Sequence, residues 1–207
     1  MKKILFATGN QTKAKRFSKG LLKNDIEVIS LADIDTNVDV EENGANAIEN
    51  ALIKARTYYK ETGMPTIAMD DTLYFDNVPE EKQPGMYVRR VNGKRLTDEE
   101  MIEHYSNLAK EYGTDGKITA RWIYGMALIK DGKEYTYTWS KNDFYLTDTP
   151  SDKVNPGYPL NTISINKKLN KYFTDITEED KKLIQEDESD VINFIVNNVT
   201  DNIDLYK

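Results

Sequence analysis

The sequence of 207 residues predicts an α/β protein built on a mixed β-sheet with flanking helices. Two observations predict this class. Strand-like and helix-like segments alternate over the first half of the chain, which is typical of parallel strands joined by helices. A strong antiparallel hairpin pattern follows in the middle, so the sheet must be mixed. No internal repeat or long linker divides the chain, and we therefore expect a single domain over residues 1–207.

Composition and charge exclude several classes of protein. The absence of cysteine excludes disulfide frameworks, thiolate zinc sites and cysteine nucleophiles. A formal net charge of −7 argues against binding of long nucleic acid, which needs a basic face, although a small phosphate ligand remains possible. The apolar runs are far shorter than the roughly 20 residues of a membrane-spanning helix, and the one at the amino terminus is too short for a signal peptide. We expect a soluble cytoplasmic protein without a membrane partner.

The first candidate for phosphate binding is a glycine turn between a strand and a helix. An apolar strand covers residues 3–7, and a helix over residues 12–22 carries its apolar side chains on one face. Lys13 lies in the first helical turn, and the turn before it consists of Thr8, Gly9 and Asn10. Such a turn presents backbone N–H groups and the positive end of the helix dipole to an anion, although many α/β proteins begin this way without binding one.

A second strand, over residues 27–31, leads through an acidic loop that ends at Glu42. A helix then runs from about Ala45 to Tyr59. Its predicted buried stripe consists of Ile48, Leu52, Ala55 and Tyr59. Asn50 and Lys54 lie four residues apart on the opposite face, where a solvated pair is the ordinary interpretation.

The stretch from Ile67 to Phe75 predicts a buried strand that delivers Asp70, Asp71 and then the hydroxyl of Thr72. Adjacent carboxylates repel each other and are costly to desolvate, so such a pair often holds a metal or a proton. Taken alone, the pair is more often a solvated strand end. If the carboxylates at positions 41 and 42 meet it in space, the oxygens would form a pocket suited to Mg²⁺, completed by substrate phosphate and water.

The middle of the chain contains the clearest local patterns. Thr97 to Lys110 predicts a capped helix, and the only histidine, His104, lies beside its apolar stripe. A single imidazole cannot form a histidine metal site, so we expect His104 to be structural or on the surface. Residues 117–130 and 134–141 alternate as strands on either side of Asp131-Gly132, which predicts a type I′ hairpin.

The last third of the chain is predicted to contain a rigid Pro-Gly loop at residues 155–159, a strand over residues 162–165 and a helix that begins at Thr177. An acidic stretch interrupts the apolar spacing of this helix, so we expect a break near Ser189. Residues 201–207 are expected to form a loose tail.

Taken together, these motifs resemble those of the inosine triphosphate pyrophosphatase family, which acts on non-standard purine nucleoside triphosphates. The matching segments keep one order over the first two thirds of the chain: Ala7–Asn10 with Lys13, Glu41–Gly44, Glu49–Ala51 with Lys54 and Ala55, Ala68–Thr72, Pro84–Tyr87 with Arg90, and Thr119–Arg121. The resemblance implies an elongated fold with two lobes around a central cleft, and a homodimer. It also implies Mg²⁺-dependent attack of water on the α-phosphorus, which gives a nucleoside monophosphate and pyrophosphate.

The resemblance further implies roles for residues at matching positions. Those implied to bind the triphosphate are Thr8, Gly9, Asn10, Lys13, Lys54 and Thr72. Arg90 is implied to bind the substrate, and Lys13 is also counted as catalytic. Glu42 and Asp71 would be metal ligands, and Asp71 would accept the proton of the attacking water. Asp70 is a further metal candidate. Neighbouring side chains of an extended strand point to opposite faces, so Asp71 is preferred to it.

The carboxy-terminal third departs from the family pattern. The Pro-Gly loop keeps Gly157 and Tyr158, which we assign to substrate binding, but lacks the family's stacking phenylalanine and aspartate. Lys181, also assigned to substrate binding, is kept, whereas Glu186 and Asp187 replace the histidine and arginine that contact a 6-oxo purine. Sites built on such hydrogen bonds discriminate by factors of about 10⁴–10⁵. We therefore expect an altered base preference, for example for a base with an amino group in place of the carbonyl.

Two alternatives stay open at this point. The chain could be a catalytically weak nucleotide-binding or sensor protein of the same fold, although the retained Glu42, Asp71, Lys13 and Lys54 count against this. It could instead be an interaction protein without a nucleotide site, whose acidic face binds a basic partner. A thermal shift with Mg²⁺ and a nonhydrolysable triphosphate would be absent in that last case.

Overall fold

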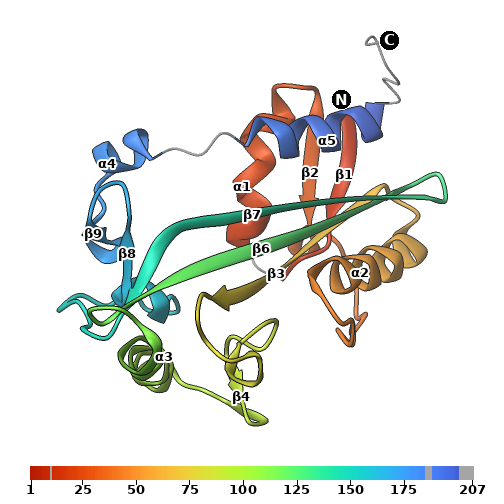
Figure 1. Ribbon diagram of the computed structural model, residues 1–207. Coiled ribbons are helices and arrows are strands. Elements are labelled where there is room, and N and C mark those ends of the chain that lie inside the picture. Colours follow the sequence, from red (N-terminus) through yellow and green to blue (C-terminus); the bar gives the residue numbers. More distant parts are fainter. Residues whose placement is uncertain (10, 185–187, 201–207) are drawn as a thin grey trace. The chain divides into compact units, whose positions relative to one another are not determined.

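The chain has a mixed α/β fold in the computed structural model, which describes residues 1–9, 11–184 and 188–200. The main sheet has the strand order β2-β1-β3-β6-β7-β8-β9, and helices flank it (Figure 1). The predicted α/β class with a mixed sheet is therefore confirmed. The chain divides into two compact units. Unit 1 comprises residues 1–71, 124–139 and 187–207, and unit 2 comprises residues 72–123 and 140–186.

Unit 1 begins with parallel strands joined by helices. β1 (Lys2–Phe6) leads through α1 (Gln11–Leu22) into β2 (Ile26–Ser30), which pairs in parallel with β1. α2 (Ala47–Thr62) then leads into β3 (Thr66–Phe75), whose first residues pair in parallel with the other edge of β1. Across the sheet, the step from β1 to β2 and the step from β2 to β3 thus run in opposite directions. Because parallel crossovers are right-handed, α1 and α2 cover opposite faces of these strands.

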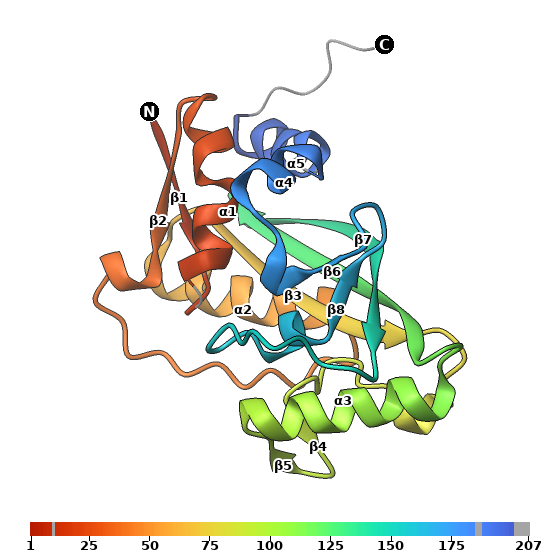
Figure 2. The same ribbon diagram turned by 90° about the vertical axis from the view of Figure 1, so that its left-hand side faces the viewer.

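The rest of unit 1 comes from the hairpin and from the last helix. The hairpin strands are β6 (Lys117–Lys130) and β7 (Lys133–Thr147). They turn at Asp131 and Gly132, with φ of +50° and +72°, so the predicted hairpin is confirmed, and β7 extends beyond its predicted end. α5 (Ser189–Thr200) packs on α1 (Figure 2), where Ile192 leaves no room for a side chain at Gly20. The apolar core beside α2 contains Leu5, Ala7, Ala51, Ala55, Tyr58, Ala68, Ala127 and Ile129.

Unit 2 is built around α3 (Asp98–Tyr112) and the remaining parts of the long strands. Its other helix is α4 (Glu178–Leu183), and its short strands are β4 (Arg90–Val91), β5 (Lys94–Arg95), β8 (Ser164–Asn166) and β9 (Lys171–Tyr172). β8 pairs in antiparallel fashion with both β7 and β9. Short 3₁₀ helices across the chain cover Leu31–Asp33, Glu80–Lys82, Pro159–Thr162 and Phe173–Asp175. The core of unit 2 includes Leu73, Phe75, Met101, Tyr105, Leu108, Phe144 and Leu146.

Helix ends follow the capping residues. The predicted cap of α3 is confirmed, since Thr97 and Glu100 form a capping box. The helix expected from about Ala45 begins at Ala47, because the side chain of Asn46 accepts the N–H of Glu49. The helix expected from Thr177 is two helices, α4 and α5, and the second begins at Ser189, where a break was expected.

The other sequence-based expectations have clear outcomes. His104 is partly buried and packs edge-on against Tyr105, with ring centroids 4.9 Å apart, in keeping with a structural role. The strand expected over residues 162–165 covers residues 164–166. The expected tail at residues 201–207 lies outside the described residues. Among the described helices, none combines the length and apolar character that crossing a membrane requires.

Candidate active site

The candidate site lies at the carboxyl end of β1 in unit 1. β1 pairs with β2 along one edge and with β3 along the other, so the strand order of the sheet reverses direction at β1. Open α/β sheets usually bind ligands at such a switch point, outside the carboxyl ends of the strands. The N–H of Ala7 donates to the carbonyl of Ile67 at 2.7 Å, and the chain continues from there into the glycine turn. Asp70 and Asp71 follow further along β3.

The two carboxylates of β3 face different helices. Asp71 forms an ion pair with Lys13 in the first turn of α1. Asp70 accepts a hydrogen bond from Nδ2 of Asn50 at 2.9 Å and lies 3.5 Å from Nζ of Lys54, both on α2. Successive side chains of an extended strand point to opposite faces, and here each face carries one helix. Asp70 and Asp71 therefore belong to two separate lysine–carboxylate contacts.

Lys54 also contacts the acidic loop. Its Nζ lies 3.0 Å from Oε2 of Glu42 and 3.2 Å from the carbonyl oxygen of Met69. The side chain of Lys54 is 12% exposed, against 42% for Glu42. One ammonium thus joins Glu42 to Asp70, which brings together two of the three predicted metal candidates.

The acidic loop also affects a tyrosine of α2. Burial raises the pKa of the Tyr58 hydroxyl, and the charges of Asp39 and Glu42 raise it further. Nearby negative charges have this effect because they disfavour a new anion. The same charges favour a cation on this side of α2.

The prediction of a solvated Asn50–Lys54 pair is wrong, since Asn50 is only 3% exposed. The predicted apolar stripe of this helix is wrong in part, because only Ala55 of its members appears among the buried residues Ala47, Asn50, Ala51, Ala55 and Tyr58. The start of α2 lies close against β6, where a Cβ on Gly125 would be 2.5 Å from the backbone nitrogen of Ile48. Polar side chains can be buried here because the carboxylates of β3 and the acidic loop satisfy them.

The glycine turn leaves its backbone accessible. Thr8 is partly buried, and its N–H donates to the carbonyl of Phe6 at 2.8 Å. Gly9 is exposed, and a Cβ there would meet nothing within 4 Å. Neither crowding within the protein nor a positive φ requires glycine at this position, so the bare backbone is available to a ligand. Asn10 lies outside the described residues.

Three of the remaining predicted residues lie in separate parts of unit 2. Thr72 is 2% exposed, and its hydroxyl donates to the carbonyl of Ile123 at 3.4 Å. Arg90 is exposed on β4. Lys181 lies on α4, where it pairs with Glu178 at 2.5 Å. Thr72 and Lys181 therefore contact neighbouring groups of unit 2, and Arg90 lies on its surface.

The Pro-Gly loop of unit 2 is tied to the start of α3. The N–H of Gly157 donates to one oxygen of Asp98 at 2.8 Å, and Arg89 donates to the other at 2.7 Å. The hydrogen bond from Arg89, followed by that from Gly157, lowers the pKa of Asp98. Tyr158, the next residue of the loop, is 50% exposed. Sequence reasoning missed Asp98 because an aspartate in a first helical turn is ordinary.

Sequence reasoning also missed a cluster beside α1. Arg16 forms an ion pair with Glu188 and lies over the rings of Tyr124 and Trp139, 5.2 and 5.9 Å from their centroids. The available signal was the row of aromatic residues in the hairpin. Glu188 directly follows residues 185–187, the predicted base-recognition positions that include Glu186 and Asp187 and lie outside the described part of the chain.

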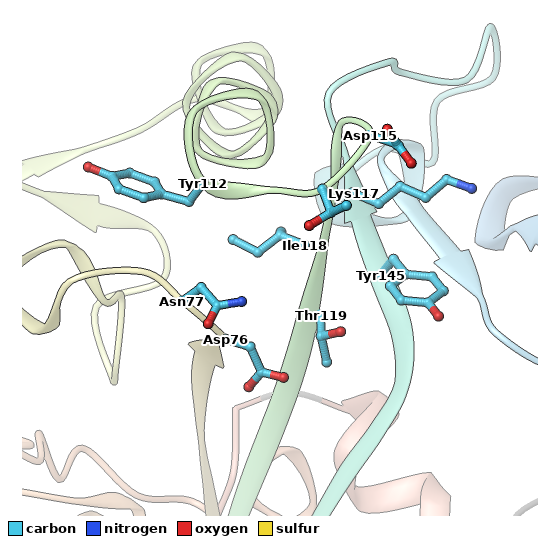
Figure 3. Close-up of a pocket in the computed structure, with 9 residues that line it drawn as sticks. Asp76, Asn77, Tyr112, Asp115, Lys117, Ile118, Thr119 and Tyr145 are labelled. Carbon is cyan, nitrogen blue, oxygen red and sulfur yellow. The ribbon is translucent and has the colours of Figure 1, made fainter.

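A separate hollow of about 330 Å³ lies in unit 2 (Figure 3). Its polar lining comes from Asp76, Asn77, Tyr112, Thr114, Asp115, Lys117, Thr119 and Tyr145. No residue predicted to act on the substrate lines this hollow, so we do not assign it to the active site.

The groups around Lys54 fit a small divalent cation. In the parts of the chain that the structure describes, no three carboxylate or imidazole side chains are grouped to hold a metal. Mg²⁺ needs fewer, since it usually takes one or two carboxylates and fills its other positions with water and substrate phosphate. Glu42 and Asp70 supply two carboxylates that already share one cation, the ammonium of Lys54.

Comparisons with known proteins agree with this fold and show the family. The profile of the Ham1 family matches residues 4–188. The dITP/XTP pyrophosphatase of Bacillus subtilis is 30% identical over 184 residues, which are 89% of this chain and 90% of its own. That of Oceanobacillus iheyensis is 35% identical over 138 residues, which are 66% of this chain and 68% of its own. The solved Ham1 protein of Staphylococcus aureus superposes with a TM-score of 0.72 and 26% identity, over 98% of this chain and 100% of that one. The match covers most of the sequence and the whole fold, and this chain therefore belongs to the Ham1 family.

Proposed function

We propose that this chain is a nucleoside triphosphate pyrophosphatase that requires Mg²⁺ and hydrolyses its substrate to a monophosphate and pyrophosphate. The observation that carries the proposal is the pair of lysine–carboxylate contacts in unit 1: Lys13 with Asp71, and Lys54 with Asp70 and Glu42. Triphosphate hydrolysis needs cations for the phosphates and carboxylates for a divalent metal. Relatives named dITP/XTP pyrophosphatase support the same reaction.

Substrate binding would exchange the partners of the two lysines. Without nucleotide, carboxylates neutralise Lys13 and Lys54. Phosphate oxygens offer the same charge-assisted contact, so the ammonium groups can move to them without becoming unpaired. Gly9 and the amino-terminal end of α1 would add N–H donors, and Thr8, whose N–H donates to Phe6, stays a predicted phosphate contact through its side chain. Five further residues, all in unit 2, stay predicted substrate-binding residues: Thr72, Arg90, Gly157, Tyr158 and Lys181.

The exchange would release Asp71 for catalysis. Its carboxylate orients a water molecule and accepts one of the water's protons as the oxygen bonds to the α-phosphorus. The bond from that phosphorus to the oxygen bridging to the β-phosphate breaks, and pyrophosphate leaves with this oxygen. Glu42 and Asp70, which share Lys54, would hold Mg²⁺, and the bound ion would supply positive charge for the phosphates of the leaving group.

The test is a panel of nucleoside triphosphates with Mg²⁺, in which pyrophosphate and orthophosphate are measured separately. We expect pyrophosphate, and a decrease of about 10²–10⁴-fold in Asp71→Asn, because a general base contributes on that scale. Asp131→Asn, at the exposed hairpin turn, is the matched control. Undiminished release in Asp71→Asn would overturn the assignment of the base. Release of orthophosphate would overturn the reaction itself, and nucleotide binding without turnover would favour a sensor.

The same panel tests the base preference. We propose that this protein does not favour 6-oxo purines, because Glu186 and Asp187 replace the donors that such bases need. A clear preference for inosine or xanthosine triphosphate over adenosine triphosphate would contradict this part of the proposal.

The oligomeric state needs its own measurement. We propose a homodimer, which the family resemblance implies. Light scattering would then give twice the monomer mass of 23.8 kDa, and a single-chain mass at working concentration would contradict it.

A further inference from the structure

α2 joins the acidic loop to β3 at two successive levels. At the first, Oδ1 of Asn50 accepts the N–H of Gly44 at 2.8 Å, and Nδ2 of Asn50 donates to Oδ2 of Asp70 at 2.9 Å. At the second, one helical turn further on, Lys54 contacts Glu42 and Asp70 at 3.0 and 3.5 Å. Both side chains therefore connect the loop that carries Glu42 to the strand that carries Asp70.

The contacts of Asn50 and those of Lys54 differ in whether a phosphate can displace them. Lys54 carries a positive charge, which the phosphates of a nucleotide attract away from the carboxylates. Asn50 is neutral and 3% exposed, and both polar atoms of its amide are hydrogen-bonded. A buried neutral amide gains little from phosphate and loses much if its bonds break. The contacts of Asn50 therefore persist when those of Lys54 are exchanged.

The loop backbone is shaped for this close contact. A Cβ on Gly44 would lie 2.6 Å from Cβ of Glu49 and 2.8 Å from Oδ1 of Asn50, so no side chain fits there. The next backbone N–H, that of Ala45, donates to Oε2 of Glu49 at 2.7 Å. The first turns of α2 thus hold two consecutive N–H groups of the loop, just after Glu42.

We propose that Asn50 is a positioning residue for the divalent cation of the active site. It keeps the loop of Glu42 against Asp70 while Lys54 moves to the nucleotide. It also orients the side chain of Asp70. Nδ2 of Asn50 donates to Oδ2 of Asp70, and Oδ1 of Asp70 is then directed at the cation position near Lys54. This inference rests on the proposed function, since the cation is part of that function. Groups that support metal ligands in this way typically change metal affinity by about 10–100-fold.

The test compares two chemically identical substitutions on one helix. Asn50→Asp keeps the side-chain shape and an acceptor for Gly44, but places a carboxylate oxygen against Asp70. Asn46→Asp is the matched control, because the exposed Asn46 donates to a different carboxylate, that of Glu49, at 3.0 Å. Asn50→Ala removes both hydrogen bonds without adding charge, and serves if Asn50→Asp fails to fold.

Two quantities are measured for each folded variant, whose folding is checked by thermal unfolding. The first is the Mg²⁺ concentration that gives half-maximal pyrophosphate release, together with kcat and KM. The second is calorimetric binding of Mg²⁺ in the presence of a nonhydrolysable triphosphate. Both Asn50 variants should raise the half-saturating Mg²⁺ concentration by about 10–100-fold, and Asn46→Asp by less than about twofold.

A merely structural role for Asn50 would lower the unfolding temperature and leave the Mg²⁺ dependence of the folded protein unchanged, which overturns the inference while the proposed function stands. If the wild type binds Mg²⁺ with the triphosphate but releases no pyrophosphate, the proposed function fails, and the binding measurements alone decide on Asn50. If the wild type with the triphosphate binds no Mg²⁺ at all, both proposals are overturned.

Discussion

Lys54 is the side chain whose removal tests the charge arrangement most directly. Lys54→Met keeps a long apolar stem and removes the ammonium that Glu42 and Asp70 share at 3.0 and 3.5 Å. In the absence of nucleotide, the two carboxylates then face each other without their common cation. The variant should therefore be less stable than the wild type.

The two contacts contribute unequally to this loss. Lys54 and Asp70 have side chains 12% and 17% exposed, so their contact resembles a buried pair, whose disruption costs about 3–5 kcal/mol. At 3.5 Å, an effective dielectric constant of about 20 gives an attraction of about 5 kcal/mol before desolvation, which agrees with that range. Glu42 is 42% exposed, so its contact adds at most about 1 kcal/mol. Methionine is easier to bury than an ammonium, which offsets part of the loss, and we expect a net decrease of about 2–3 kcal/mol.

The same variant should bind Mg²⁺ more tightly when no nucleotide is present. In the wild type, the ammonium of Lys54 competes with Mg²⁺ for both carboxylates. Removal of a competitor worth about 2–3 kcal/mol corresponds to about 30–150-fold tighter binding. Pyrophosphate release should nevertheless fall by about 10²–10³-fold, because the phosphates lose a preorganised cation.

Urea unfolding, calorimetric titration with MgCl₂ and steady-state kinetics measure these three quantities. Lys60→Met, on the exposed side of α2, is the matched control and should change none of them appreciably. Unchanged stability together with weaker binding of Mg²⁺ to nucleotide-free Lys54→Met would refute the shared-cation arrangement.

Two further predictions concern stability within each unit. The hydrogen bond from Lys171, the largest of several, lowers the pKa of Asp180 from 3.8 to about 2, so its stabilising contribution is complete above about pH 4 and is lost as the pH falls toward 2. Asp180→Asn should therefore lower the unfolding temperature at pH 7 and have a smaller effect at pH 2.5, and an equal effect at both pH values would contradict this. Arg16→Met removes the ion pair with Glu188 and the contacts with aromatic rings, and should lower the free energy of unfolding in urea by about 2–4 kcal/mol. Full stability in Arg16→Lys would show that the planar guanidinium is not required.

Much of the fold could be predicted because its signals are local. The positive φ angles at Asp131-Gly132 close the hairpin, and the side chains of Thr97 and Glu100 start α3 through bonds that span three residues. The glycine turn after β1 likewise placed Lys13 in the first turn of α1. Such features depend on backbone angles and short-range hydrogen bonds that the residue types themselves favour.

The candidate site was predicted as a set of residues, but its pairings were not. Helical periodicity predicted Asn50 on the solvent side, because an assignment from periodicity uses only the polarity of each side chain. The buried face of α2 instead includes a polar residue whose partners lie in β3 and the acidic loop. Asp98 and Arg16 were missed for the same reason, since each is an ordinary surface residue until its distant partner is known.

The sequence by itself determined the strand–turn–helix order, the helix caps, the hairpin turn and the types of charged residue at the site. Only the tertiary structure decided that Asp71 meets Lys13, that Glu42 and Asp70 share Lys54, and that Asn50 is buried between loop and strand. Lys13 and Asp71 are 58 positions apart, and Asn50 and Asp70 are 20 apart. Their contacts depend on the placement of β1 beside β3 and on the close packing of α2 against β6, and no local pattern in the chain specifies either.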